Sequence, residues 1–268
     1  MNDTTPTAAR EPRLEVRDLR IRFGERPVVD MERLDLRAGE ILGLAGESGS
    51  GKSMTSLAVL GLAGTLGATV EGSIRLDGEE LVGAPEHRML QIRGSRIAAI
   101  FQSPVASLDP LTRVGELFER TLRVHGASRE QARERSAEAL LAVLLSPELL
   151  QRYPHQLSGG QAQRVVIAMA VALRSEVLLA DEPTSALDVT VQAEILELLR
   201  RLRDERGMSV LFITHDLAVI SELCDRLAVM RAGRIVEEGS TPLVLGDPQH
   251  VYTRELVGAV PRIRVVGS

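Results

Sequence analysis

The sequence predicts an α/β fold built around a parallel sheet, and two kinds of segment support this prediction. Three apolar runs have the length and composition of buried strands: residues 41–45, 177–180 and 209–214. Each run is followed by glycines or polar residues and then by a stretch that can form a helix. Ligands of parallel α/β sheets bind beyond the carboxyl ends of the strands, so we expect functional residues directly after these three runs.

The composition is that of an ordinary globular protein. The 268 residues are 44% hydrophobic and 26% charged, enough for one large domain or two small ones. The longest apolar stretch, residues 165–173, is shorter than the roughly 18–20 residues of a membrane span, and we expect no secretory signal. The single cysteine, Cys224, excludes an internal disulfide and indicates a reducing compartment such as the cytosol. A net charge of −5 argues against a nucleic-acid binder that depends on bulk positive charge.

A glycine-rich segment after the first strand run carries the strongest signal. Residues 46–53 fit the pattern G-x-x-x-x-G-K-[ST] and precede a predicted helix over 54–62. Glycines let backbone N–H groups point at phosphate oxygens, and the helix N-terminus adds its positive dipole end. Lys52, the only lysine among 32 lysines and arginines, would reach the β- and γ-phosphates, and Ser53 would bind Mg²⁺. A mere glycine-rich turn is the alternative. The predicted nucleotide-binding residues are Gly46, Glu47, Ser48, Gly49, Ser50, Gly51, Lys52, Ser53 and Met54.

The second and third strand runs end in side chains suited to hydrolysis. Asp181 and Glu182 follow residues 177–180, and His215 follows residues 209–214. At the carboxyl edge of the sheet, Asp181 would lie beside the Mg²⁺, and Glu182 would orient or deprotonate the attacking water. His215 would contact the γ-phosphate and hold the water geometry. The alternatives are a strand-end cap for the acids and a structural role for the histidine.

A second glycine pair opens another predicted helix, over residues 162–173. It lies in the segment 157–161 (LSGGQ), which has the spacing of a helix capping box. Two glycines in the first turn lower helix propensity, so the cap alone does not account for them. They are accounted for if bare backbone N–H groups must approach an anion, although a plain helix start remains the alternative. The candidate anion-binding residues are Ser158, Gly159, Gly160 and Gln161.

Taken in order, these segments resemble the nucleotide-binding domain of an ABC transporter over roughly residues 14–260. The resemblance implies a P-loop NTPase of the ABC ATPase type, with a RecA-like parallel core, an antiparallel β subdomain and an inserted α-helical subdomain. It identifies Gln102 as the Q-loop glutamine, which would contact Mg²⁺ and water and link to membrane subunits. Residues 185–188 (SALD) resemble the D-loop, with Asp188 at the nucleotide. Phe23 resembles the aromatic that stacks on adenine, and a core position is its alternative.

The resemblance also implies that one chain cannot complete an ATP site. In the family, the phosphate loop of one subunit faces the LSGGQ segment of another across a head-to-tail dimer, with two ATP molecules between them. This sequence has one copy of each motif. Ser158, Gly159 and Gln161 would therefore serve the ATP of a partner subunit, which would be a related but different chain.

The resemblance suggests three parts along the chain. We expect a flexible tail over residues 1–13, a nucleotide-binding domain over 14–240 and a short C-terminal extension over 241–268. Helical periodicity from 114 to 145 matches the helical subdomain of the family, at about residues 103–172, whose surface receives the coupling helices of the membrane subunits.

Two segments narrow the resemblance to the peptide/nickel importer subfamily. Residues 248–256 (PQHVYTREL) resemble its C-terminal pattern, with Val251 in place of the usual proline, and residues 101–116 also match. A metal site at His250 is not expected, because no second ligand follows at a useful spacing.

Two further helices carry local signals. Ser128 and Gln131 have the spacing of a capping box, and Asp188 is the expected N-cap of a helix that ends at Arg206. Arginines on this last helix have acidic neighbours, so a solvated face is favoured over a nucleic-acid surface.

The leading interpretation is the ATP-hydrolysing subunit of an importer. With ATP and Mg²⁺ as ligands, it would drive uptake of peptides, nickel or a metal chelate through two permease subunits. It would lie at the cytoplasmic face of the inner membrane, with an extracytoplasmic binding protein delivering the cargo and no nucleic-acid partner. One alternative is a soluble ABC ATPase that acts on ribosomes or nucleic acid. Another is an inactive regulatory subunit, against which Glu182 and His215 argue.

Overall fold

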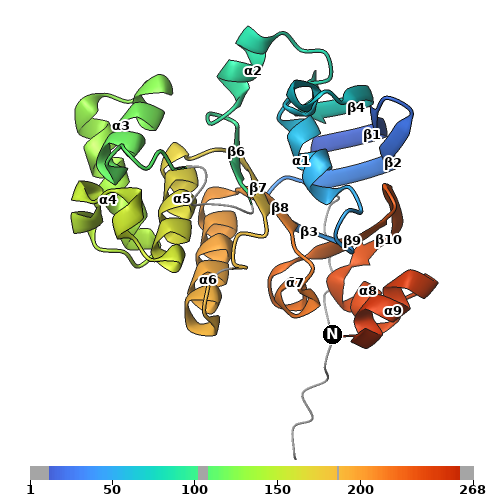
Figure 1. Ribbon diagram of the computed structural model, residues 1–268. Coiled ribbons are helices and arrows are strands. Elements are labelled where there is room, and N and C mark those ends of the chain that lie inside the picture. The colour runs from blue at the N-terminus through green and yellow to red at the C-terminus, as the bar shows by residue number, and fades with distance from the viewer. Residues whose placement is uncertain (1–11, 102–107, 186, 260–268) are drawn as a thin grey trace, which may run out of the picture.

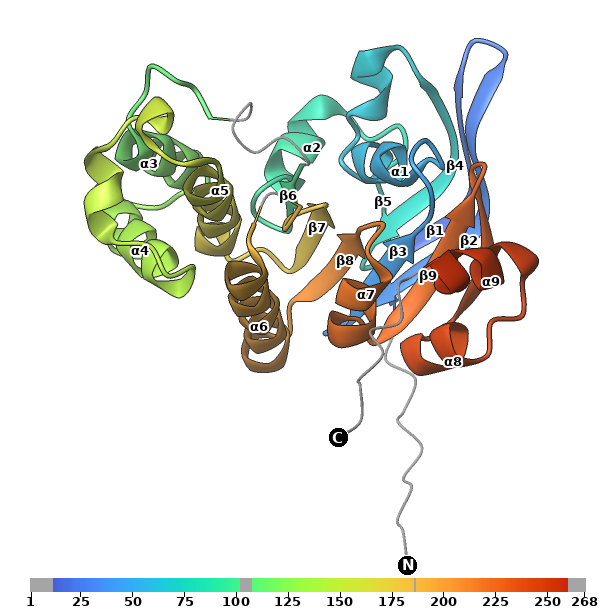
Figure 2. The ribbon, with the colours of Figure 1, turned by 60° about the horizontal axis from the view of Figure 1, so that its bottom comes forward.

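The computed structural model describes residues 12–101, 108–185 and 187–259, and it confirms the predicted α/β fold class (Figure 1). The strands form a six-stranded, mostly parallel sheet and a four-stranded antiparallel sheet. A group of helices lies to one side of the two sheets in both views (Figures 1 and 2). These three parts correspond to the parallel core, the antiparallel β subdomain and the helical insertion that the family resemblance implied.

The parallel sheet contains all three predicted strand runs, in the order β10-β9-β3-β8-β7-β6. Strands β3 (Ile41–Ala45), β8 (Ser209–Ile213) and β7 (Val177–Asp181) lie next to one another, and all their residues are buried. Apolar runs of this kind form strands that are covered on both faces. The carboxyl ends of the three strands therefore meet at one edge. The remaining strands are β6 (Ile97–Ile100), β9 (Arg226–Arg231) and β10 (Arg234–Ser240), the last antiparallel to β9.

The antiparallel sheet lies against one face of the parallel sheet. Its inward side chains, such as Val16 and Met31, share a core with Leu42 and Leu44 of β3. Alternation of buried and exposed residues along its strands is typical of a sheet with one covered face. This packing places the sheet beside the strand that leads into the glycine-rich loop. Its strands are β1 (Pro12–Phe23), β2 (Arg26–Arg37), β4 (Thr69–Leu76) and β5 (Glu79–Glu80), in the order β2-β1-β4-β5.

Helices cover the other face and the ends of the parallel sheet. Residues of β3, β7 and β8 that point away from the antiparallel sheet, such as Phe212 and Val210, form a second core with residues 195–202, residues 217–223 and the helical group. The helices outside the helical group are α1 (Lys52–Val59), η1 (Ala63–Leu66), α2 (Glu86–Ile92), α6 (Val189–Arg206), α7 (Leu217–Leu223), α8 (Thr241–Gly246) and α9 (Val251–Ala259).

The helical group forms where sequence periodicity predicts it. The predicted helical stretch over 114–145 consists of two helices separated near Gly126, whose φ is 84°. The predicted capping box is confirmed: Ser128 Oγ accepts from the Gln131 N–H at 3.1 Å, and Gln131 Oε1 accepts from the Ser128 N–H at 2.9 Å. The group comprises α3 (Val114–Val124), α4 (Arg129–Ala142), η3 (Pro147–Gln151), η4 (Pro154–Gln156) and α5 (Gly159–Leu173).

The single cysteine of the chain is part of the core. Cys224 follows α7 and packs over β3, where a Cβ on Gly43 would lie 3.1 Å from the Cys224 sulfur. Burial raises the pKa of the Cys224 thiol. Because the thiolate is the reactive form of cysteine, this side chain is a packing residue rather than a nucleophile.

Candidate functional site

The glycine-rich loop joins β3 to α1 and packs closely against its surroundings. Gly46 and Gly51 have φ values of 154° and 108°, which residues with side chains rarely adopt. A Cβ on Gly46 would lie 2.1 Å from the carbonyl oxygen of Met230, and one on Gly51 would lie 3.0 Å from that of Val28. A Cβ on Gly49, whose φ is 81°, would meet no atom within 4 Å. The outer glycines are therefore required by close backbone approach, and the middle of the loop is open to a ligand.

Lys52 is the first residue of α1, and its ammonium group turns back into the loop. Its Nζ donates to the carbonyl oxygens of Gly46 and Glu47, at 2.7 and 2.8 Å, and to Ser50 Oγ at 3.3 Å. These contacts match the three protons of an ammonium group. Burial lowers the pKa of Lys52, and the carboxylates of Asp181, Glu182 and Glu47 oppose this effect. The loop thus holds the Lys52 ammonium group at the position where the phosphate-binding pattern requires a positive charge.

Asp181 ends β7 and is hydrogen-bonded to the hydroxyl of Ser53. Burial raises the pKa of Asp181, and the hydrogen bond from Ser53 lowers it. A carboxylate and a hydroxyl are ligands that Mg²⁺ accepts, usually together with phosphate oxygens and water. Among the described residues, no group of three or more His, Cys, Asp or Glu could hold a metal ion. The Asp181–Ser53 pair supplies two oxygen ligands, which leaves the other positions around a Mg²⁺ ion to phosphate oxygens and water.

Glu182 and His215 lie in contact beyond the carboxyl ends of β7 and β8. His215 Nδ1 is 2.6 Å from Glu182 Oε1, and the Glu182 N–H donates to the Ile213 carbonyl oxygen at 2.8 Å. The φ of Glu182 is 50°, a left-handed conformation that is costly for a residue with a side chain. Such strain persists where the surrounding structure enforces it, often at functional sites. The sheet therefore brings the predicted acid and histidine together.

The second glycine pair lies at the start of α5. The predicted capping box is confirmed: Ser158 Oγ accepts from the Gln161 N–H at 3.3 Å, and Gln161 Oε1 accepts from the Ser158 N–H at 3.0 Å. A Cβ on Gly159 would meet no atom within 4 Å, so this turn is open. In both views α5 belongs to the helical group, whereas α1 lies beside the antiparallel sheet (Figures 1 and 2). One chain does not bring its two glycine segments together.

The remaining predicted site residues have different surroundings. Phe23 is half-buried at the end of β1 and packs into neither core cluster. Met54 is half-buried in the first turn of α1 and packs against the core shared with the antiparallel sheet. Asp188 is the N-cap of α6, as predicted: its Oδ1 accepts a hydrogen bond from the Val191 N–H at 3.0 Å. Gln102 lies outside the described residues.

Two contacts of this region were not predicted. Gln163 of α5 is 1% exposed and donates from Nε2 to the Pro183 carbonyl oxygen, which ties this helix to the turn after Glu182. Tyr252 of α9 accepts a hydrogen bond at 2.8 Å from the backbone N–H of Glu47. The C-terminal sequence pattern marks the segment that contains Tyr252, but no local signal indicates where that segment packs.

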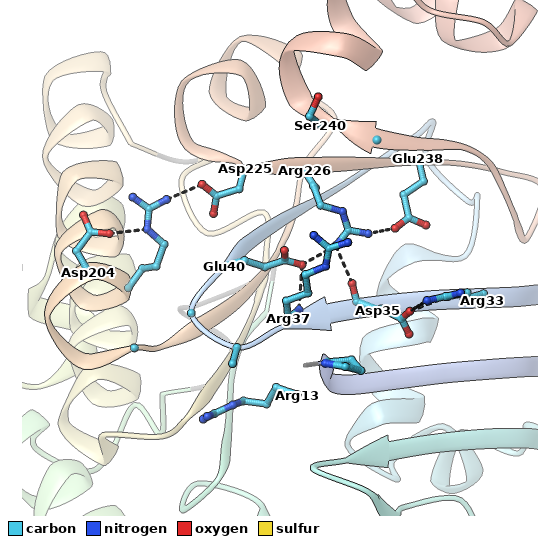
Figure 3. Close-up of a pocket in the computed structure, with 16 residues that line it drawn as sticks. Arg13, Arg33, Asp35, Arg37, Glu40, Asp204, Asp225, Arg226, Glu238 and Ser240 are labelled. Atoms are coloured by element: carbon cyan, nitrogen blue, oxygen red, sulfur yellow. Dashed lines mark hydrogen bonds and ion pairs between the residues drawn. The ribbon is translucent and has the colours of Figure 1, made fainter. Parts of the chain in front are cut away.

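A cavity of about 1650 Å³ lies at the opposite edge of the parallel sheet, where β3, β8 and β9 begin (Figure 3). Its charged groups pair with one another: Arg226 binds Glu40 at 2.8 Å and also Glu238, and Arg203 binds Asp225 at 2.9 Å. This cavity lies at the amino end of β3, whereas the phosphate loop follows the carboxyl end of that strand. The cavity is therefore not the nucleotide site. Its ion pairs hold β9 to the strands on either side.

A buried strand, a glycine-rich loop with its lysine, and carboxylates at a neighbouring strand end together define a P-loop nucleotide-binding protein. The chain belongs to the ABC transporter family, whose model matches residues 29–185. It is accordingly an ATPase of the ABC type, which confirms the family and the enzyme class expected from the sequence. No helix among the described residues is both long enough and apolar enough to span a membrane.

Several known proteins are similar to the chain over most of its length. The peptidoglycan transport ATP-binding protein YejF of Agrobacterium fabrum is 48% identical over 263 residues, which cover 94% of this chain and 48% of that protein. The oligopeptide transport ATP-binding protein OppD of Salmonella typhimurium is 45% identical over 275 residues, which cover 98% of this chain and 82% of that protein. The solved ATP-binding cassette MJ0796, in a post-hydrolysis state bound to ADP and Pi, has a TM-score of 0.75 at 32% identity and covers 85% of this chain and 98% of its own. The chain therefore spans about half the length of YejF and most of the other two.

Proposed function

We propose that this protein is the ATP-hydrolysing subunit of an importer that takes up peptides. The observation that carries the proposal is the Lys52 ammonium, held at 2.7 and 2.8 Å by loop carbonyls near the carboxylates of Asp181 and Glu182. Peptide cargo is inferred because YejF and OppD are named for the transport of peptidoglycan and oligopeptides. Nickel or a metal chelate, which the subfamily resemblance also allowed, has no such support.

The phosphates of ATP would bind along the loop. The open backbone at residues 48–49 and the start of α1 would supply N–H donors, and Lys52 would supply the positive charge. Phe23, which packs into neither core cluster, would be available to the adenine ring.

Ser53 and Asp181 would hold Mg²⁺ together with the bound phosphates, and Gln102 would complete the set. The cation would neutralise charge on the phosphate oxygens during transfer. The contribution of the chain is to hold the hydroxyl and the carboxylate in contact before the ligand arrives.

Glu182 would orient and deprotonate the attacking water. Its carboxylate lies at the strand ends beside the exposed His215, where a water next to the γ-phosphate would be within its reach. His215 would hold Glu182 through Nδ1, at 2.6 Å, and present Nε2 to the γ-phosphate. The two residues thus divide the task into proton acceptance and positioning.

A second ATPase subunit would complete each site. Ser158, Gly159, Gly160 and Gln161, on an open helix start, would face the ATP of that subunit, with Asp188 at the same interface. The second subunit would be a related but different chain, and the pair would bind two permease subunits at the cytoplasmic face of the inner membrane. An extracytoplasmic protein would deliver the peptide. Within the chain, residues 14–240 would form the nucleotide-binding domain, with the helical subdomain at about 103–172 and an extension over 241–268.

A non-transport ATPase that acts on ribosomes or nucleic acid is not favoured. The similar proteins named above are transport ATP-binding proteins. Two of the four arginines of α6 that could suggest a nucleic-acid surface are paired with acids: Arg200 with Glu197 and Glu222, and Arg203 with Asp204.

The experiment that tests the proposal is reconstitution of the chain with its second ATPase subunit and permeases in vesicles. We expect Mg²⁺-dependent ATP hydrolysis and ATP-dependent uptake of labelled peptide. Hydrolysis without peptide uptake, together with uptake of nickel, would reject the peptide cargo. Absence of ATP binding by the purified chain would reject the proposal as a whole.

A further inference from the structure

The C-terminal helix α9 contacts the phosphate loop through one tyrosine. Tyr252 is 5% exposed, and its hydroxyl accepts a hydrogen bond at 2.8 Å from the N–H of Glu47. The Arg231 guanidinium lies over the tyrosine ring, with its Cζ 4.7 Å from the ring centroid. The ring is thus fixed by burial and by this contact, and the hydroxyl is fixed at the loop.

The N–H that Tyr252 binds belongs to the same peptide group as the carbonyl of Gly46. That carbonyl accepts from Lys52 Nζ at 2.7 Å. A peptide group is planar, so an acceptor that fixes the direction of its N–H also fixes the direction of its C=O. Tyr252 is therefore connected to the Lys52 ammonium through one rigid unit.

The rest of the C-terminal segment supports this contact. The turn after β9 binds the other half of the loop, because the Gly233 N–H donates to the Ser50 carbonyl oxygen at 2.9 Å. The start of α9 is held by Glu237 of β10, whose carboxylate accepts from the N–H groups of Gln249 and His250 at 2.8 and 2.9 Å. The position of Tyr252 is thus determined by the same hairpin that borders the phosphate loop.

We infer that Tyr252 is a positioning residue for nucleotide binding: its hydroxyl orients the 46–47 peptide, and this peptide presents Lys52 to the phosphates. The inference rests on the proposed binding of ATP at Lys52. It gives the C-terminal extension a part in setting the affinity for nucleotide. Because Glu182 and His215 follow other strands, we expect an effect on the KM for ATP and little effect on kcat.

The variant Tyr252→Phe tests the inference, because it removes the acceptor and keeps the ring under Arg231. We expect ATP and ADP to bind about three- to tenfold more weakly by calorimetry, the loss typical of one hydrogen bond. The KM for ATP of the reconstituted complex should rise by a similar factor, with kcat within about twofold of the wild type. The control is Tyr153→Phe, which changes the only other tyrosine of the chain, in the helical group, and should leave the affinity unchanged.

The outcomes separate this inference from the proposed function. Wild-type affinity in Tyr252→Phe, while Lys52→Ala loses ATP binding, would overturn the role of Tyr252 and leave the phosphate site in place. Wild-type affinity in Lys52→Ala would overturn the proposed site, and the inference with it. Equal losses in the Tyr252 and Tyr153 variants would overturn the inference, since they would show a general effect of hydroxyl removal.

A second measurement needs no variant and covers the case in which Tyr252→Phe fails to fold. In the nucleotide-free wild type, amide exchange by NMR should show the Glu47 N–H protected at least about tenfold more than the Gly49 N–H. The latter has no hydrogen-bond partner within the residues that the structure describes. Equal exchange of the two amides would overturn the inference.

Discussion

The exchange of Glu182 for glutamine tests whether this carboxylate activates the attacking water. Glutamine keeps the size of the side chain and can still contact His215 Nδ1, which lies 2.6 Å from Glu182 Oε1, but it cannot accept a proton at neutral pH. Loss of a general base costs about 10²–10⁴-fold in rate, or about 2.7–5.4 kcal/mol of activation free energy. We expect turnover to fall by such a factor while ATP affinity stays within about threefold, since phosphate binding is assigned to the loop around Lys52.

The assay is phosphate release by the assembled complex at saturating Mg-ATP, with ATP binding measured in parallel. Glu176→Gln is the matched control, because Glu176 directly precedes β7 at the far edge of the sheet and pairs with Arg13 at 3.4 Å. Turnover of the control should equal that of the wild type.

The contact between Glu182 and His215 provides a further check through a double variant. If the histidine acts through the acid, Glu182→Gln combined with His215→Ala should be no more than about twofold slower than the slower single variant. Unchanged turnover in Glu182→Gln, or an equal loss in Glu176→Gln, would refute the assignment of the base.

The remaining predictions concern the loop, its charge and the second glycine pair. Lys52→Ala should weaken ATP binding by at least about tenfold, since charge-assisted hydrogen bonds contribute about 1.5–3 kcal/mol each, and calorimetry that finds unchanged affinity would contradict this role. ATP affinity should also fall as the pH rises toward 10.5, the ordinary pKa of lysine, because burial lowers the pKa of Lys52 and only its ammonium form is a cation. A wild-type affinity that depends on pH no more than that of Lys52→Ala would contradict this prediction. Gly46→Ala should lower the melting temperature, because its Cβ would lie 2.1 Å from a carbonyl oxygen, whereas Gly64→Ala meets no atom within 4 Å and should not. Ser158→Arg should leave nucleotide binding by the isolated chain intact and abolish turnover of the assembled pair; full turnover would exclude a shared site.

Features that depend on neighbouring residues could be predicted from the sequence. The capping boxes at Ser128 and Ser158 and the N-cap at Asp188 form as predicted, because the groups involved are three residues apart. The same is true of the phosphate loop, in which glycine spacing permits the φ values of 154° and 108° at Gly46 and Gly51.

Contacts between strand ends could also be predicted, although they join distant residues. Parallel strands align their carboxyl ends, so three apolar runs were enough to bring Asp181, Glu182 and His215 to the edge where Lys52 lies. The sequence pattern indicates the edge but not the contact of 2.6 Å between Glu182 and His215, which depends on the left-handed backbone at Glu182.

Side-chain contacts between segments far apart in the sequence could not be predicted. Tyr252 and Glu47 are separated by 205 residues, and Arg226 and Glu40 by 186. No periodicity or spacing rule links such pairs, because the tertiary packing of α9 and of β9 decides which partner each side chain meets.

The sealed position of Cys224 behind β3 has a practical consequence for spectroscopy. Thiol-directed dyes and spin labels should not react with Cys224, because it is buried. A cysteine introduced at an exposed position such as Val189, which is 83% exposed, would then be labelled selectively, and the native cysteine could stay in place. A probe at this position, paired with a probe on the second ATPase subunit, would report the distance over which the pair closes when ATP binds and reopens after hydrolysis.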